Sequence, residues 1–380
     1  MKIAIVGGGS SAHLLAVLLS IRGHEVRVLT HKPAAWKNEL TLVTDDGDLH
    51  GRIACATDDP LKVFEGTEAA FLCMPVHQYP SAVRWILPAL AKNPQCLVGP
   101  VYGQAGFDWI MRAAARDAGI PVPRYFAIGL LPWITRTLSY GERAVYYGMN
   151  AANTIATQSA TDFDFLQEKL LDDLAVAHWG KGRFSRAPSF LALTLTVDNQ
   201  IIHPGRCYAL MQAERGWETP EDVPLLYADW EEVSTGILGT LDRDYSTVRS
   251  ALRTRFGGDA EDYGIDFLTL QSRTYEYDCT DIAGFFRNEP SLARIRPPLK
   301  QMANGLWYLD VNHRFLKDDF AFGLEICNWF AAQLRCEVPA VAGLLSWFHS
   351  HIQPHQDAII APGTPAAYGF TLDDVIANRR

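Results

Sequence analysis

Short apolar runs alternate with longer amphipathic stretches in the first half of the chain. The runs are bounded by Gly, Pro or charged residues and are short enough to be buried strands. They are KIAIV (2–6), EVRVLT (25–30), AAFLCM (69–74) and QCLVG (95–99). Helix-like segments follow residues 10, 77 and 105. Strands that alternate with helices predict right-handed crossover connections and a parallel sheet.

Two further stretches predict strands outside this alternation. Residues 39–57 read as a hairpin, with Asp46-Gly47 at the turn between two runs of alternating polar and apolar residues. Residues 144–157, AVYYGMNAANTIAT, predict additional strands that complete the first domain.

The hydrophobic pattern changes near residue 186. Beyond it, apolar residues recur at three- and four-residue spacings, as in 225–256 and 322–334, which predicts amphipathic helices. The stretch SRAPS at 185–189 is the expected boundary between the two domains. We therefore expect an α/β domain over residues 1–185 and a mostly α-helical domain over residues 186–380.

The composition fits two folded domains and excludes some partners. Of 380 residues, 48% are hydrophobic and 11% aromatic, enough to bury two cores, which argues against disorder. The 34 basic and 43 acidic residues leave a net charge of −9 with no long basic run, so nucleic acid is not an expected partner.

Cysteine usage and the N-terminus bear on the compartment. The seven cysteines are scattered and form no C-x-x-C pair, so we expect neither a disulfide framework nor a zinc site. This cysteine usage predicts that the protein resides in a reducing cytoplasm. The N-terminus carries no signal-peptide pattern. No apolar stretch reaches the roughly 18–20 residues that span a bilayer, so no membrane association is expected.

A glycine-rich turn predicts a dinucleotide site. Gly7, Gly9 and Ala12 have G-x-G-x-x-A spacing between a predicted strand and a predicted helix. Gly7 permits the tight turn, Gly9 lets backbone approach a pyrophosphate, and Ala12 keeps helix and strand close. The helix N-terminus, which begins near Ser10, supplies N–H donors and the positive end of a dipole.

The end of the second predicted strand bears on the choice of cofactor. An NAD site usually has Asp or Glu there to bind the ribose 2′-hydroxyl, whereas this chain has Thr30-His31-Lys32. A hydroxyl and a cation suit a 2′-phosphate better, which favours NADP(H). If Lys32 contacts only solvent, it does not favour a 2′-phosphate, and NAD(H) remains the alternative cofactor.

Several stretches together resemble the octopine/opine dehydrogenase family, whose members reductively couple an amino acid to a 2-oxo acid. The resemblance covers about residues 1–330. It rests on the glycine turn and on four further blocks, which are YGQAGFDW (102–109), LPWITR (131–136), NQIIHPG (199–205) and HRFLKDDFAFGL (313–324). It implies a Rossmann-type N-terminal domain followed by a helical catalytic and substrate domain, in agreement with the hydrophobic pattern.

The resemblance implies roles for residues of the last two blocks. The histidine of N-x-x-x-H-P, here His203, would be the catalytic acid/base, and Asp319 would hold its other ring nitrogen. Arg314 matches an arginine that reaches the cofactor pyrophosphate, and Asn199 matches an asparagine that helps to set the substrate carbonyl. The neighbouring Asp318 leaves the choice of carboxylate partner open.

The earlier blocks imply substrate contacts. Gln104 and Thr135 fall where family blocks face the substrate. Thr135 stands where a small cysteine is often found, and no block identifies the amino acid that is coupled.

The chemistry of imine formation agrees with these roles. Adding an amine to a ketone gives a carbinolamine, which loses water before hydride attacks the imine carbon. These steps need a group that exchanges protons near neutral pH, and histidine, with an ordinary pKa of about 6.5, suits them best. A carboxylate on the second nitrogen fixes the tautomer and stabilises the imidazolium.

Structural roles are the alternative for each of these residues. Asn199 and His203 would share a face of a helix and could simply bond to each other or to a core carbonyl. Asp318 and Asp319 could be a solvated pair at a helix start. The histidines of HSHIQPHQD (349–357) suggest a metal, but Pro354 disrupts a helix there, and we expect no metal site.

The function expected from the sequence is an NAD(P)H-dependent opine dehydrogenase that acts on an L-amino acid and a 2-oxo acid such as pyruvate. One alternative is a simple 2-oxo or 2-hydroxy acid reductase of the wider 6-phosphogluconate dehydrogenase-like superfamily, although no lysine lies in a comparable block. Another is a non-catalytic NADP(H)-sensing protein. The sequence leaves a homodimer open.

Overall fold

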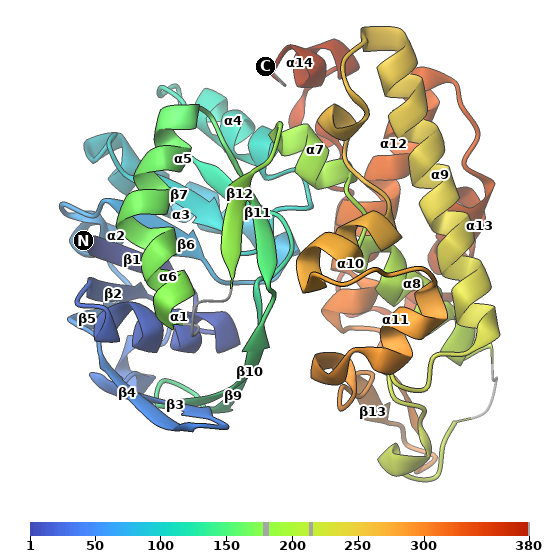
Figure 1. Cartoon of the computed structure of the whole chain (residues 1–380), viewed down its shortest axis with the longest axis horizontal. Coiled ribbons are helices and arrows are strands. Elements are labelled where there is room, and N and C mark those ends of the chain that lie inside the picture. Colours follow the sequence, from blue (N-terminus) through green and yellow to red (C-terminus); the bar gives the residue numbers. More distant parts are fainter. Residues whose placement is uncertain (178–181, 213–215, 379–380) are drawn as a thin grey trace. The chain divides into compact units, whose positions relative to one another are not determined.

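A computed structural model describes residues 1–177, 182–212 and 216–378 of the chain (Figure 1). The chain divides into two units, Met1–Leu193 and Thr194–Arg380. The first is drawn from blue to green in Figure 1, and the second continues through yellow to red.

The N-terminal unit is built on a five-stranded sheet with the order β5-β2-β1-β6-β7, in which every pairing is parallel. Its strands are β1 (Lys2–Val6), β2 (Glu25–Leu29), β5 (Cys55–Thr57), β6 (Ala69–Leu72) and β7 (Leu97–Pro100). In the central strand β1, residues 3–6 are completely buried. Strands of a parallel sheet are covered on both faces, which is why they carry continuous apolar runs.

Helices connect the strands of this sheet, as the alternation predicted. Helix α1 (Ser10–Ile21) follows β1, α3 (Tyr79–Lys92) joins β6 to β7, and α4 (Phe107–Asp117) comes after β7. The buried face of α1 runs without interruption from Ala12 to Leu19. Further helices of the unit are α2 (Pro60–Phe64), α5 (Ala160–Leu166), the π-helix η3 (Gln167–Leu171), α6 (Asp172–Ala177) and the short 3-10 helices η1 (Pro33–Ala35) and η2 (Val76–Gln78).

Two smaller sheets complete the N-terminal unit. The expected hairpin is present as β3 (Glu39–Thr44) and β4 (Gly47–Arg52), in a sheet with the order β4-β3-β10-β9. The other sheet has the order β12-β11-β8. Their other strands are β8 (Phe126–Ile128), β9 (Trp133–Ser139), β10 (Arg143–Met149), β11 (Ala152–Thr157) and β12 (Arg183–Arg186).

The C-terminal unit is mostly helical, which confirms the predicted fold class. Its longest helix is α9 (Glu232–Phe256), which packs against α8 (Asn199–Met211), α12 (Glu325–Leu334) and α13 (Pro339–Trp347). Further elements include α7 (Phe190–Leu195), which ends in this unit, α10 (Phe267–Tyr275), α11 (Ile282–Asn288), β13 (Leu299–Gln301), β14 (Trp307–Leu309), the 3-10 helix η7 (Arg314–Leu316), the π-helices η8 (Phe320–Leu324) and η9 (Phe348–Ile352), and α14 (Leu372–Ala377). Across the described ranges, no helix combines the length and the apolar character needed to cross a bilayer.

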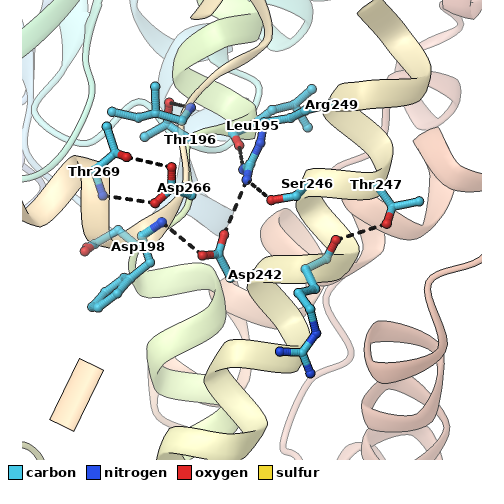
Figure 2. Close-up of polar contacts among 12 residues, drawn as sticks. Leu195, Thr196, Asp198, Asp242, Ser246, Thr247, Arg249, Asp266 and Thr269 are labelled. Carbon is cyan, nitrogen blue, oxygen red and sulfur yellow. Dashed lines mark hydrogen bonds and ion pairs between the residues drawn. The ribbon is translucent and has the colours of Figure 1, made fainter. Parts of the chain in front are cut away.

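A buried arginine anchors the segment that leads into α8 (Figure 2). Arg249 of α9 donates to the carbonyl of Leu195 at 3.0 Å, to Ser246 at 2.6 Å and to Asp242 at 3.3 Å. The hydroxyl of Thr196 accepts the Ile265 N–H at 3.2 Å. These contacts tie residues 195–196 to α9 and to the chain before α10, and thereby fix where α8 begins.

Candidate active site

The predicted histidine lies on α8, which makes an unusually close contact with α9. His203 is 1% exposed and is followed inside the helix by Pro204, whose missing N–H interrupts the hydrogen-bond ladder. A Cβ on the next residue, Gly205, would lie 3.2 Å from a methyl group of Ile237 on α9. The glycine therefore lets the two helices approach at the level of the histidine.

A second glycine brings the predicted carboxylate to the histidine. Asp319 directly precedes the π-helix η8, which packs on α8. A Cβ on Gly323 of η8 would lie 2.4 Å from the Cβ of Gln200 on α8. Because only glycine fits, the two backbones come close enough for the Asp319 side chain to reach across.

His203 and Asp319 form a buried hydrogen-bonded pair. The imidazole Nδ1 lies 2.8 Å from Asp319 Oδ2, and the aspartate is 4% exposed. Phe315 stacks on the imidazole with 3.5 Å between ring centroids. When Asp319 is ionised, its carboxylate can only accept, so Nδ1 donates and Nε2 carries the lone pair.

The lone pair of His203 Nε2 faces the hydroxyl of Tyr227. The two atoms are 3.0 Å apart, and Tyr227 is 7% exposed. With Nδ1 donating to Asp319, the phenol must donate to Nε2. Neither the residue pattern nor the family blocks predicted Tyr227, because it lies in an irregular segment between α8 and α9.

Burial disfavours the charged form of each partner. Burial lowers the pKa of His203 well below its ordinary value, and the positive charge of Arg314 lowers it further. Burial also raises the pKa of Asp319 well above its ordinary value, although the same Arg314 charge opposes that shift. The imidazole is therefore neutral near pH 7, with the lone pair of Nε2 directed at the Tyr227 hydroxyl.

A third buried acid lies at the start of the same helix. Asp198 directly precedes α8, and its carboxylate accepts from the amide of Gln271 at 2.8 Å. Burial raises its pKa to about 7, and the Gln271 hydrogen bond only partly offsets this. The sequence pattern gave no signal for Asp198.

The other predicted residues of this unit lie on the same elements. Asn199 is the first residue of α8 and is half-buried, one turn before His203. Arg314 is half-buried, and its guanidinium lies 4.8 Å from the centre of the Phe315 ring. Asp318 is also buried, but the hydrogen bond to His203 Nδ1 comes from Asp319.

A fully buried arginine organises the segment that carries Tyr227. Arg206 of α8 is 0% exposed and donates to the carbonyls of Leu225, Leu226 and Asp229 at 2.9–3.0 Å. Arg206 therefore fixes the backbone on both sides of Tyr227, and the sequence analysis did not single out this arginine.

The glycine turn in the N-terminal unit fits a dinucleotide. Gly7 has φ +116°, and a Cβ there would lie 2.5 Å from the carbonyl oxygen of Cys73, so only glycine is accommodated. A Cβ on Gly9 would meet only that oxygen, at 3.7 Å, which leaves the approach to the start of α1 open. Ala12 is completely buried. The N-terminus of α1 could hold a pyrophosphate through its backbone N–H groups and the positive end of the helix dipole.

A tyrosine that the sequence motifs did not predict lies over this turn. A Cβ on Gly8 would be 2.2 Å from the hydroxyl of Tyr140, which in turn lies 3.0 Å from the hydroxyl of Thr30. Lys32 Nζ is 5.8 Å from the centre of the Tyr140 ring. Thr30, a predicted cofactor contact, is only 4% exposed, and its hydroxyl is hydrogen-bonded to that of Tyr140.

The hairpin that carries Tyr140 is fastened to α1. His13 Nδ1 lies 2.9 Å from the carbonyl of Gly9, and its Nε2 accepts the Gly141 N–H at 2.7 Å. The hydroxyl of Ser10 accepts the Thr137 N–H at 2.9 Å. Ser10, predicted as a cofactor contact, therefore also binds β9.

The two predicted substrate residues of the N-terminal unit are buried. Gln104 is 2% exposed and lies just before α4. Thr135 is 3% exposed, and its hydroxyl donates to the carbonyl of Val145 at 2.7 Å. That hydroxyl stabilises the β9–β10 pairing, and both residues lie in a different unit from His203.

The histidine-rich stretch near the C-terminus forms helical turns. His349 Nε2 lies 2.9 Å from Glu325, and His351 Nδ1 lies 3.2 Å from the carbonyl of Trp347. Within the described ranges, no three His, Cys, Asp or Glu side chains are grouped so that they could hold a metal ion. All seven cysteines are free thiols.

A family model matches most of the helical unit. Residues 186–352 match the family model described as NAD/NADP octopine/nopaline dehydrogenase, alpha-helical domain. The matched range contains α8, η8, His203 and Asp319. The resemblance that the sequence blocks indicated is thereby confirmed.

Two curated relatives align over nearly the whole chain. An uncharacterised protein of Sinorhizobium fredii is 27% identical over 91% of this chain and 94% of its own length. An opine dehydrogenase of Haliotis discus hannai is 22% identical over 100% of this chain and 98% of its own length.

Solved structures share the fold. An octopine dehydrogenase determined with NADH and L-arginine has a TM-score of 0.80 at 21% identity, over 100% of this chain and 98% of that one. A yersinopine dehydrogenase with bound NADP+ has a TM-score of 0.64 at 18% identity, over 92% and 90% of the two chains.

Proposed function

We propose that this protein is an opine dehydrogenase, because residues 186–352 match the model of the octopine/nopaline dehydrogenase helical domain. It would condense an L-amino acid with a 2-oxo acid such as pyruvate, using NAD(P)H, to an N-(carboxyalkyl) amino acid. The observation that carries the proposal is the buried His203–Asp319 pair, since a neutral imidazole oriented by a carboxylate is the proton acceptor that this condensation needs.

His203 would exchange protons at Nε2 during condensation. It takes a proton from the nitrogen as the amine adds to the carbonyl and returns it to the alkoxide, which gives the carbinolamine. It then moves the second nitrogen proton to the carbinolamine hydroxyl, which leaves as water. Asp319 keeps the other proton on Nδ1 and stabilises the imidazolium that forms between the two steps. Asn199, one helical turn earlier, would orient the carbonyl, and Arg314 would bind anionic groups of the substrate or cofactor.

The glycine turn would hold the cofactor, which supplies the hydride when bound. We propose NADP(H) as the preferred form, because β2 ends in Thr30-His31-Lys32 without an acidic residue. Structures of similar fold hold either form, NADH in an octopine dehydrogenase and NADP+ in a yersinopine dehydrogenase, so this choice depends on the residues of the chain itself. Gln104 and Thr135 remain proposed substrate-facing residues.

The test is a matrix of amino acids and 2-oxo acids with NADH and NADPH. NAD(P)H should be oxidised only when both an amine and a 2-oxo acid are present, and mass spectrometry should find the secondary-amine dicarboxylate. Equal oxidation with the oxo acid alone would indicate a simple reductase. Cofactor binding without turnover in any combination would indicate a sensing protein.

The same assay tests the pair. His203→Asn and Asp319→Asn should each lower kcat/KM by about 10²–10⁴-fold, the usual contribution of general acid–base catalysis, and leave cofactor affinity unchanged. His349→Asn is the matched control, because His349 also contacts a carboxylate, Glu325, outside the proposed site. Full activity in His203→Asn would contradict the proposed role.

A further inference from the structure

Both ring nitrogens of His203 are occupied by protein groups. Nδ1 is bonded to Asp319 and Nε2 to Tyr227, and the ring face is covered by Phe315. We infer that Tyr227 is a catalytic residue that relays protons between His203 and the substrate. This inference rests on the proposed opine dehydrogenase function.

The hydroxyl of Tyr227 lies where a group that exchanges a proton with His203 Nε2 would lie. Its oxygen lies 3.0 Å from Nε2, within the distance at which a proton passes directly between two heavy atoms. His203 is 1% exposed and Tyr227 is 7% exposed. The hydroxyl of Tyr227 occupies the one hydrogen-bonding position of Nε2, so a proton that reaches this nitrogen passes through the phenol.

The surroundings of Tyr227 hold it in this position. Its ring stacks on Phe286 with 5.5 Å between centroids, and Phe286 stacks on Trp230 at 3.9 Å. The guanidinium of Arg206 lies 5.6 Å from the Trp230 ring. The stacking on Phe286 therefore fixes the orientation of the Tyr227 ring, and the hydroxyl at its end points to His203.

The backbone on either side of Tyr227 is held as well. Arg206 donates to the carbonyls of Leu225 and Leu226 before it and Asp229 after it. Burying a guanidinium costs free energy unless its donors are satisfied, and here several of them are used to fix one short segment. Such an arrangement suits a group that must keep a set distance to its partner.

The relay balances without any further reactant. When the amine adds to the carbonyl, the new C–N bond leaves a proton on nitrogen. That proton passes to Tyr227 Oη while the phenolic proton passes to His203 Nε2. The imidazolium then returns a proton to Oη, and the phenolic proton goes to the alkoxide oxygen, which completes the neutral carbinolamine. In a second cycle the remaining proton on the same nitrogen follows the same path to the carbinolamine hydroxyl. The C–O bond then breaks and water leaves, with tyrosine and histidine both neutral again.

The test is Tyr227→Phe, which keeps the ring and removes the relay oxygen. We expect kcat for the condensation to fall by at least about tenfold, since general acid–base transfer is commonly worth 10²–10⁴-fold and some direct transfer can persist. In mixtures of light and heavy water, single-turnover rates of the wild type should depend on the deuterium fraction in a curved manner, because two protons move together. The variant should show a linear dependence. Cofactor affinity should not change.

Tyr263→Phe is the matched control. Tyr263 is also buried in this unit and donates to the carbonyl of Gly257 at 2.7 Å, so its variant loses a comparable hydrogen bond. That variant should keep both the rate and the curved isotope dependence. If Tyr227→Phe is as fast as the wild type or faster, or keeps the curved dependence, the relay is refuted and the tyrosine only covers the histidine.

A second measurement separates this inference from the proposed function. The ¹⁵N chemical shift of His203 Nε2 reports the hydrogen bond from Tyr227 whether or not any substrate is turned over. It should move in Tyr227→Phe while Nδ1 stays unchanged. An inactive wild type would refute the proposed function, and an unmoved Nε2 shift would refute the contact on which the relay depends.

Discussion

At the scale of single residues, the proposed site combines groups whose charged forms are disfavoured by burial. His203 and Asp319 face each other, and Asp198 lies at the start of the same helix. None of the three is more than 4% exposed. Such groups make the free energy of unfolding depend on pH, because they titrate differently in the folded and unfolded chain.

Asp198 gives the most direct pH prediction. Its pKa is about 7 in the folded chain, against an ordinary value of 3.8, so between these values the folded chain binds more protons. The stability of the wild type should therefore fall, relative to Asp198→Asn, as the pH rises from about 4 to about 7. The difference should reach a few kcal/mol at most, since one pKa unit corresponds to ~1.4 kcal/mol.

Urea unfolding of both proteins at several pH values checks this prediction. His203 has a lowered pKa, so its contribution has the opposite sign and is lost as the pH falls below its ordinary 6.5. That contribution is present in both proteins and cancels in the comparison. A stability difference that does not change with pH would contradict the shifted pKa of Asp198.

At the scale of elements, glycines decide how closely the helices of the C-terminal unit approach. Gly205 brings α8 to α9, and Gly323 brings η8 to α8. The hydrogen bond between His203 and Asp319 depends on the second contact, because the two residues are on different elements.

Gly323→Ala tests that contact. Its new methyl group would lie 2.4 Å from the Cβ of Gln200, so η8 must move away from α8. We expect a loss of about 1–3 kcal/mol in stability, as for other overpacked cores, and a fall in condensation activity. Denaturant unfolding and the coupled assay measure the two effects.

Gly343→Ala is the control for this substitution. Gly343 lies in the interior of α13, and a Cβ there would meet no atom within 4 Å. Alanine should raise stability by roughly 0.5–1 kcal/mol through helix propensity and leave activity unchanged. Equal behaviour of the two variants would show that the close packing of η8 does not matter.

Some of these elements and contacts could be predicted from the sequence, and others could not. The parallel sheet, the Asp46-Gly47 hairpin and the helical second unit follow from local periodicity, and the pairing of His203 with Asp319 came from the family resemblance. Tyr227 and Tyr140 were missed because their contacts join residues 24 and 110 positions apart through irregular segments. The π-helix η8 was missed because its conformation depends on packing against α8.

At the scale of the whole molecule, each unit has its own buried core. The glycine turn lies entirely in the N-terminal unit. A ligand that binds only the folded form of that unit stabilises it by mass action, by about 2.7 kcal/mol at a concentration one hundred times its Kd.

Thermal unfolding with and without NADPH tests this assignment. The cofactor should raise the Tm of the wild type and leave that of Gly7→Ala unchanged, because a Cβ at Gly7 would strike the Cys73 carbonyl. Gly23→Ala is the control. It has a similar positive φ, of +84°, but open space around its Cβ, so it should lose stability and keep the cofactor-induced shift. A Tm shift retained in Gly7→Ala would place the cofactor elsewhere.

The tyrosine over the glycine turn has a consequence for protein engineering. Tyr140 reaches Gly8 from a hairpin that pairs with β3, outside the parallel sheet, and His13 pins that hairpin to the first helix. Grafting only the first strand, turn and helix onto another scaffold would leave the turn uncovered and its histidine without an amide to accept. A functional transplant must carry the hairpin along, although more than one hundred residues separate the two in the chain.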